Sequence, residues 1–151
     1  MLKVDPLHNH FAGEATGIDL SAPLARDAVA EIEAAMDRYT VLVFRGQPLT
    51  QDQQVRMTRS FGPLDLGLKK VKKQADRLQY AELADISNVG VDGRPVDRNH
   101  RKVVGNIANQ LWHSESSFQK PAARYSMLSA VVTRPGVAIP SSPTCAPPTT
   151  D

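Results

Sequence analysis

The clearest pattern of apolar and polar positions lies in residues 21–39. Apolar side chains recur there at the i, i+3, i+7 spacing of an amphipathic helix: Val29, Ile32 and Met36, with Ala28 and Ala35 beside them. We therefore predict a surface helix from Ser21 to Tyr39 that packs one face against the rest of the protein.

A short apolar run and a second helix follow. The continuous apolar character of Tyr39 to Phe44 is typical of a strand buried on both faces. Thr50 and Gln53 have the spacing of a capping box. A helix is therefore expected from Gln51 to about Ser60, ending before Gly62.

The rest of the chain is predicted to be mostly strand. Asp85 to Val89 precedes an Asp92-Gly93 turn, and two further β-rich segments run from Val103 to Trp112 and from Arg124 to Val132. This order of helices followed by strands favours an α+β chain whose strands form part of a jelly-roll sheet.

Composition excludes several classes of protein. With 151 residues, 41% of them hydrophobic, the chain is long enough for one domain with its own core. A net charge of +2 argues against nucleic-acid binding, and no run of about 18 apolar residues is present to span a membrane. The N-terminus has no apolar signal region, and the single Cys145 has no internal partner, so we expect a cytoplasmic protein.

Composition changes abruptly at Gly136. Residues 137–150 contain no charged side chain and no periodicity, and four prolines lie between Pro140 and Pro148. We divide the chain into a domain at 1–136 and a Pro/Thr-rich tail at 137–151 that reads as disordered.

One pair of residues suggests metal chemistry. His113 and Glu115 are two positions apart, and on an extended strand such residues point the same way. An imidazole and a carboxylate form part of the facial triad of non-haem Fe(II) oxygenases. In this composition the spacing arises by chance roughly 0.4 times, so a sheet histidine and an exposed strand carboxylate remain alternatives, and we expect the neighbouring Trp112 to be in the core.

The surrounding residues carry a resemblance. Residues 111–118 (Leu-Trp-His-Ser-Glu-Ser-Ser-Phe), with the Val41 to Pro48 segment, the Phe61-Gly62-Pro63 turn and Tyr80 to Val89, closely resemble the taurine and 2,4-dichlorophenoxyacetate dioxygenases. The phenoxyacetate branch is the nearer likeness, except that its usual Asp ligand is replaced by Glu115. The resemblance spans about Asp5 to Gly136.

This resemblance implies a fold and a reaction. The fold is the N-terminal half of a double-stranded β-helix, and the cofactors are Fe(II), held by His113 and Glu115, and the cosubstrate 2-oxoglutarate. A small carboxylate substrate and dioxygen are the expected partners, and a homo-oligomer of the full-length parent is also considered. Hydroxylation beside the ether oxygen of a phenoxyacetate gives a hemiacetal that breaks down to a phenol and glyoxylate, with succinate and CO2.

The resemblance also indicates residues for the substrate. Lys70, within a basic run at 69–73, is expected to pair with an anionic substrate, although a solvated loop is the alternative. Asn109, Ser116 and Ser117 are candidates for the pocket, and Asn109 also suits a turn.

The sequence of the tail can be explained by a shift of the reading frame. Family members continue after this point with Gly-Asp-Thr-Glu-Phe, and a back-translation of residues 138–150, shifted by one base, encodes that continuation. We therefore expect a single-base deletion or a sequencing error near the codons for Gly136 and Val137. Resequencing tests this expectation against a natural Pro/Thr-rich terminus.

The missing residues leave two interpretations of the chain itself. The second histidine ligand and the arginine that binds 2-oxoglutarate lie downstream in the family. The chain is therefore expected to be a truncated and inactive part of a dioxygenase, and a small non-catalytic binding module is the alternative.

Overall fold

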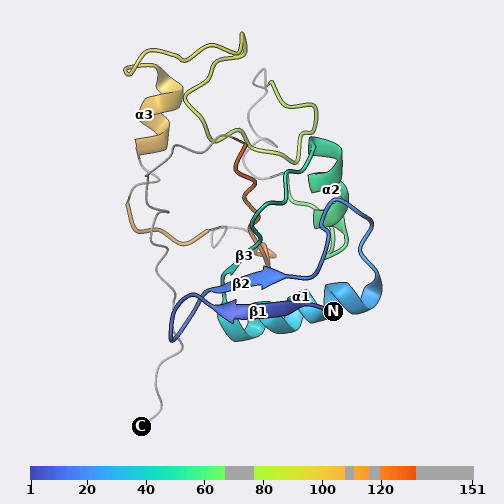
Figure 1. The fold of residues 1–151 in the computed structure, drawn as a ribbon. Coiled ribbons are helices and arrows are strands. Elements are labelled where there is room, and N and C mark those ends of the chain that lie inside the picture. Colours follow the sequence, from blue (N-terminus) through green and yellow to red (C-terminus); the bar gives the residue numbers. More distant parts are fainter. Residues whose placement is uncertain (67–76, 108–110, 116–119, 132–151) are drawn as a thin grey trace. The chain divides into compact units, whose positions relative to one another are not determined.

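The structure, a computed structural model, describes residues 1–66, 77–107, 111–115 and 120–131. The chain divides into two compact units, one comprising Met1–Phe61 with Ser129–Asp151 and the other comprising Gly62–Leu128. The helices and strands of the first unit are drawn in blue to green in Figure 1, and α3 of the second unit in yellow. Each unit is described by itself below.

The first unit contains a three-stranded sheet in the order β1-β2-β3. β1 (Lys3–Pro6) pairs antiparallel with β2 (Gly13–Thr16), and β2 pairs in parallel with β3 (Leu42–Val43). A Cβ atom at Gly13 would overlap Val4 and press against the ring of Tyr39. Glycine at this position therefore lets the strand lie close to its neighbours.

The expected strand at residues 39–44 is confirmed only at Leu42–Val43. It pairs with β2, and its residues are half-buried rather than fully buried. In the described part of the chain no second strand pairs with its other edge. The prediction of burial on both faces was therefore wrong for this strand.

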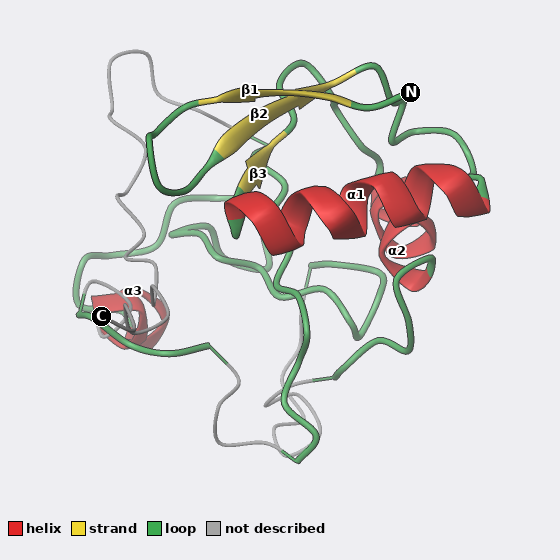
Figure 2. Ribbon diagram, turned by 90° about the horizontal axis from the view of Figure 1, so that it is seen from below, coloured by secondary structure: helices red, strands yellow, loops and turns green. Residues whose placement is uncertain are grey.

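The predicted amphipathic helix is present as α1 (Arg26–Tyr39), with Ile32 and Ala35 buried. It covers one face of the sheet, as Figure 2 shows. The helix begins five residues later than predicted because Asp19 accepts hydrogen bonds from the amide and hydroxyl of Ser21 at 2.8 and 2.6 Å. This local turn, followed by Pro23, keeps the segment before Arg26 out of the helix.

The second predicted helix is α2 (Gln51–Arg59), and its capping box is formed on both sides. The Gln53 amide donates to the Thr50 hydroxyl at 3.2 Å, and the Thr50 amide donates to the Gln53 side chain at 2.8 Å. Two amides that have no partner within the helix are satisfied in this way. Val55 and Met57 are its buried side chains.

Replacing Thr50 with alanine should lower the free energy of unfolding by about 1 kcal/mol, because the Gln53 amide loses its acceptor. Urea denaturation followed by far-ultraviolet circular dichroism measures this change. Ser60→Ala is the control, since the Ser60 hydroxyl makes only a 3.5 Å contact with the Arg56 carbonyl. Equal losses in both variants would contradict the assigned role of the capping box.

The second unit contains a helix where a strand was predicted. α3 (Arg101–Ile107) occupies the start of the segment expected to be a strand from Val103 to Trp112. His100 initiates this helix: its ring Nδ1 accepts from the Lys102 amide at 3.2 Å, and its carbonyl accepts from the Val104 amide at 3.0 Å. This local capping outweighs the β preference of the paired valines.

The other predicted strands of this region are not formed. The Asp92-Gly93 turn is confirmed, with Gly93 at φ 78°, but only an isolated bridge between Val89 and Pro95 flanks it. No strand is assigned to residues 124–131, the described part of the segment predicted from Arg124 to Val132. The expected order of helices followed by strands is therefore wrong: all strands of the described ranges come before residue 44.

The buried apolar residues of the described chain all lie in the first unit. They are Ala15, Leu20, Ile32, Ala35, Val55 and Met57. In the described part of the second unit, by contrast, large apolar side chains such as Val104, Leu111 and Leu128 are exposed. Burial of apolar surface therefore stabilises the first unit far more than the second. Within the described ranges, no helix has the length and apolar character needed to cross a bilayer.

Candidate metal centre

His113 and Glu115 lie side by side in the second unit. Nε2 of His113 is 3.9 Å from Oε2 of Glu115. The side chains are 48% and 65% exposed, so both are accessible to a small ion from solvent. The imidazole and the carboxylate therefore lie close to each other, although not on the strand from which this was predicted.

The orientation of the imidazole is fixed by a backbone contact. Nδ1 of His113 lies 2.8 Å from the carbonyl oxygen of Leu111. Because a carbonyl can only accept, Nδ1 carries the proton in this arrangement and donates it. In the neutral imidazole the lone pair is then on Nε2, the atom that faces Glu115, and this is the tautomer required of a metal ligand.

The pair fits two adjacent positions around a divalent cation after a small adjustment. Nitrogen and oxygen ligands about 2.1 Å from one ion and at right angles to each other lie about 3 Å apart. Since Nε2 of His113 and Oε2 of Glu115 are 3.9 Å apart, the exposed Glu115 side chain must move closer to the imidazole to share an ion with it. One imidazole and one carboxylate also match the donor types of a mononuclear iron site.

A third protein ligand is not placed with them. Among the residues that the structure describes, no group of three or more His, Cys, Asp or Glu side chains is positioned to share an ion. His8 and His10 are near each other, with ring centroids 5.7 Å apart, but they belong to the hairpin between β1 and β2 in the first unit. Within the described ranges, His113 and Glu115 thus lie together without a third candidate ligand beside them.

The backbone around the pair differs from the prediction. Residues 111–115 are irregular and not a strand. Trp112, expected in the core, is 74% exposed. With no sheet formed at this point in the described residues, no opposing face is available to bury the indole ring.

The four predicted substrate residues, Lys70, Asn109, Ser116 and Ser117, lie outside the described residues. So does the expected tail at 137–151. Their roles stay predictions.

A cluster of charged side chains around Asp85 was missed by the sequence analysis. Arg77 donates to both carboxylate oxygens of Asp85, from Nε at 2.6 Å and from an Nη at 3.0 Å. Lys102, on α3, donates to the same carboxylate at 2.8 Å. The side chain of Asp85 is only 9% exposed, so this ion pair is largely shielded from solvent.

Lys102 makes two further contacts in the cluster. Its ammonium donates to the Val89 carbonyl at 2.7 Å and lies 3.3 Å from the Ser87 hydroxyl. Together with Asp85, these contacts use all three donors of the ammonium group. The cluster thereby connects α3 to residues 85–89.

Electrostatics keep the central carboxylate ionised. The hydrogen bonds from Arg77 hold the pKa of Asp85 well below its usual range. Partial burial opposes this effect, and the hydrogen bonds from Lys102 and Ser87 reinforce it. Asp85 is therefore an anion at neutral pH, paired with two cations.

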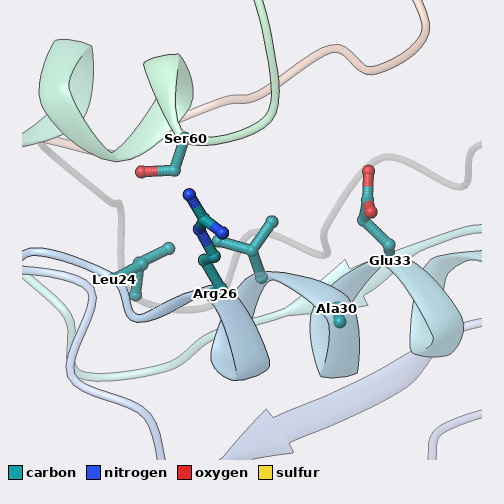
Figure 3. Close-up of a pocket in the computed structure, with 6 residues that line it drawn as sticks. Leu24, Arg26, Ala30, Glu33 and Ser60 are labelled. Atoms are coloured by element: carbon teal, nitrogen blue, oxygen red, sulfur yellow. The ribbon is translucent and has the colours of Figure 1, made fainter.

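The first unit has a shallow hollow of about 280 Å³, shown in Figure 3. It lies between the first turns of α1, from which Arg26 and Glu33 come, and Ser60 at the end of α2. Neither His113 nor Glu115 lines it. The hollow has no feature of a metal site, and we assign it no role.

Comparison with known proteins identifies the family of the chain. Residues 3–137 match the model of the family described as "Taurine catabolism dioxygenase TauD, TfdA family". This match covers most of the chain, including the pair at 113 and 115.

Curated relatives agree with that match. The chain is 60% identical over 131 residues to an alpha-ketoglutarate-dependent 2,4-dichlorophenoxyacetate dioxygenase of Cupriavidus pinatubonensis, covering 87% of this chain and 46% of the relative. It is 56% identical to the protein of the same name from a Burkholderia species, covering 85% of this chain and 43% of the relative. A (S)-phenoxypropionate/alpha-ketoglutarate-dioxygenase of Sphingobium herbicidovorans is 32% identical, covering 85% of this chain and 40% of the relative. The chain thus spans about half the length of the curated relatives it matches.

A solved structure shares the fold. The crystal structure of AAD-2 in complex with Mn(II) and N-oxalylglycine is 37% identical and aligns with a TM-score of 0.66, covering 79% of this chain and 38% of that one. This likeness is consistent with a partial jelly-roll fold. Taken together with the family match over residues 3–137, it leads to one conclusion: the chain belongs to the taurine catabolism dioxygenase TauD, TfdA family.

Proposed function

We propose that this chain supplies two metal ligands of an Fe(II)- and 2-oxoglutarate-dependent dioxygenase that hydroxylates phenoxyacetate-type substrates. The observation that carries the proposal is the geometry of His113, whose Nε2 faces the Glu115 carboxylate at 3.9 Å while Nδ1 is held by the Leu111 carbonyl. The names of the relatives at 60% and 56% identity support 2,4-dichlorophenoxyacetate as the leading substrate.

The residues of the chain have distinct roles in this proposal. Fe(II), bound together with 2-oxoglutarate, supplies the dioxygen chemistry that hydroxylates the carbon beside the substrate's ether oxygen and yields succinate and CO2. His113 and Glu115 hold the ion, and the Leu111 carbonyl keeps the imidazole in the binding tautomer. Glu115 is one methylene longer than the aspartate usual in the phenoxyacetate branch, so its carboxylate would hold the ion through a longer and more adjustable side chain.

Substrate binding is assigned to residues outside the described ranges. Lys70 pairs with the substrate carboxylate, since an ammonium and a carboxylate in a partly dry pocket attract strongly. Asn109, Ser116 and Ser117 complete the pocket with hydrogen-bonding groups. A cytoplasmic location and a homo-oligomeric full-length parent are part of the same proposal.

We further propose that the chain of 151 residues is inactive by itself. Two ligands leave an ion weakly held, and the described residues provide no third one. Residues 137–151 are proposed to be a frameshifted tail that replaces the family continuation. A small non-catalytic binding module is the second candidate, and the compact first unit with its own buried residues favours it.

An assay of the purified chain separates these functions. We expect anaerobic Fe(II) to bind weakly, while 2-oxoglutarate adds no visible absorbance and 2,4-dichlorophenoxyacetate yields no succinate. Succinate released in proportion to 2-oxoglutarate would contradict the proposed inactivity while supporting the dioxygenase function. A folded chain with no response to Fe(II) would contradict the metal site and favour the binding module.

A further inference from the structure

Large apolar side chains are exposed mainly in the second unit. On α3, Val104 and Ile107 are three positions apart, so they share one face of the helix, and both are at least half exposed. Leu111 and Trp112 are neighbours in the chain and are 71% and 74% exposed, and Leu128 is 84% exposed. Apolar surface that gathers in one part of a protein is typical of an interaction site.

The second unit has no apolar core of its own within the described residues. All the buried apolar side chains of the described chain belong to the first unit. The helix α3 has only seven residues, and a helix of this length is marginal in water unless one face is packed. The exposed apolar side chains of this unit therefore need an apolar surface from another polypeptide segment to become buried.

The lengths of the relatives indicate which segment supplies that surface. The family match over residues 3–137 includes the whole second unit, so this unit is part of the family domain. The chain nevertheless covers only 46% of the Cupriavidus relative and 38% of AAD-2, whose fold aligns at a TM-score of 0.66. More than half of each relative is thus further polypeptide that has no counterpart in this chain.

We propose that the exposed apolar side chains of the second unit are the docking surface for the remaining, C-terminal part of the full-length dioxygenase, and that this part binds the chain even as a separate polypeptide. The inference rests on the proposed function, in which the chain is one half of such an enzyme. The residues assigned to the surface are Val104, Ile107, Leu111, Trp112 and Leu128.

Reconstitution from two polypeptides tests this docking surface. The probe is the part of the Cupriavidus relative beyond the segment that this chain matches, refolded together with the whole chain. Trp112 is the only tryptophan of the chain, so labelling the chain with 5-fluorotryptophan gives a single ¹⁹F resonance. We expect a one-to-one complex in sedimentation velocity. The ¹⁹F resonance should shift and lose its response to exchange of H2O for D2O, because the indole ring becomes buried.

Two variants place a charge on the docking surface. Ile107→Lys and Leu128→Lys should each weaken the complex at least about tenfold, because an apolar side chain loses its burial and an ammonium enters the interface. Both side chains are exposed in the chain alone, so its circular dichroism should stay unchanged. Leu7→Lys is the matched control: Leu7 is also exposed but lies in the first unit, and this variant should bind the probe like the wild type.

Several results would overturn the proposal. The matched segment of the relative, refolded with the same probe, is the reference for binding. Failure of the chain to bind, whether or not this reference binds, would show that the C-terminal part is not the occupant. Equal affinities of the two surface variants and Leu7→Lys would place the contact elsewhere. A dimer of the chain alone with the same ¹⁹F shift would make a second copy the occupant.

Failure of the proposed function gives a different result. The reconstituted complex is supplied with Fe(II), 2-oxoglutarate and 2,4-dichlorophenoxyacetate, and succinate is measured. A complex that buries Trp112 but releases no succinate would support the docking surface while contradicting the dioxygenase function. Succinate release that Ile107→Lys and Leu128→Lys reduce, and Leu7→Lys does not, would support both.

Discussion

His113→Ala should lower the affinity of the chain for Fe(II) or Mn(II) by at least about 100-fold. Removing a group that merely orients a ligand costs 10- to 100-fold, and here the ligand itself is removed. Glu115 would remain as a single exposed carboxylate, whose attraction for a cation is largely offset by hydration. The affinity is measured by titrating the purified chain with the metal under anaerobic conditions.

The matched control is His8→Ala. This variant removes another exposed imidazole, which lies in the hairpin between β1 and β2. Its ring Nδ1 already accepts the amide of His10 at 3.2 Å, so that lone pair is not available to an ion. We expect its affinity to equal that of the wild type. If the two alanine variants weaken binding to the same extent, the ion is held nonspecifically and the assignment fails.

Ile32→Ala should destabilise the first unit by about 2–5 kcal/mol, the range for truncating a buried isoleucine. Ile32 is 5% exposed in α1 and is one of only six buried apolar residues in the described chain. Since small domains are stabilised by 5–15 kcal/mol in total, this loss is a large fraction of the stability. Urea denaturation monitored by helical circular dichroism measures it.

Leu7→Ala is the control for that measurement. Leu7 lies in the same unit and is 47% exposed, and its amide hydrogen bond to the Ala12 carbonyl does not involve the side chain. The expected loss is about 0.5 kcal/mol or less. A loss as large as that of Ile32→Ala would contradict the location of the core.

The helices could be predicted because their signals are local. The apolar stripe of α1 and the Thr50–Gln53 capping box each depend on residues within a few positions, and both are confirmed. The start of α1 was missed because the turn at Asp19 competes with the helix. The helix α3 was missed because Val103 and Val104 suggest a strand, while the capping contact of His100 gives no periodic signal.

The strands and the charged cluster depend on partners distant in the sequence. β1 and β2 are only four residues each, and the inward-facing residues of β2, Gly13 and Ala15, are too small to give a clear apolar alternation in the sequence. His113 and Glu115 lie close together, but not on the extended strand from which their common direction was predicted, and their role as metal ligands stays a prediction. The cluster at Asp85 has no such spacing, since its members meet only through tertiary structure.

The central claim is that His113 and Glu115 bind one divalent ion. Nuclear magnetic resonance of the uniformly ¹⁵N-labelled chain, with Mn(II) added in substoichiometric amounts, tests it most directly because the paramagnetic ion broadens only nearby signals. We predict that the amides of residues 111–115 broaden first, and that the effect disappears in the His113→Ala variant. Broadening centred on the His8–His10 hairpin or on Asp19, with residues 111–115 unaffected, would contradict the claim.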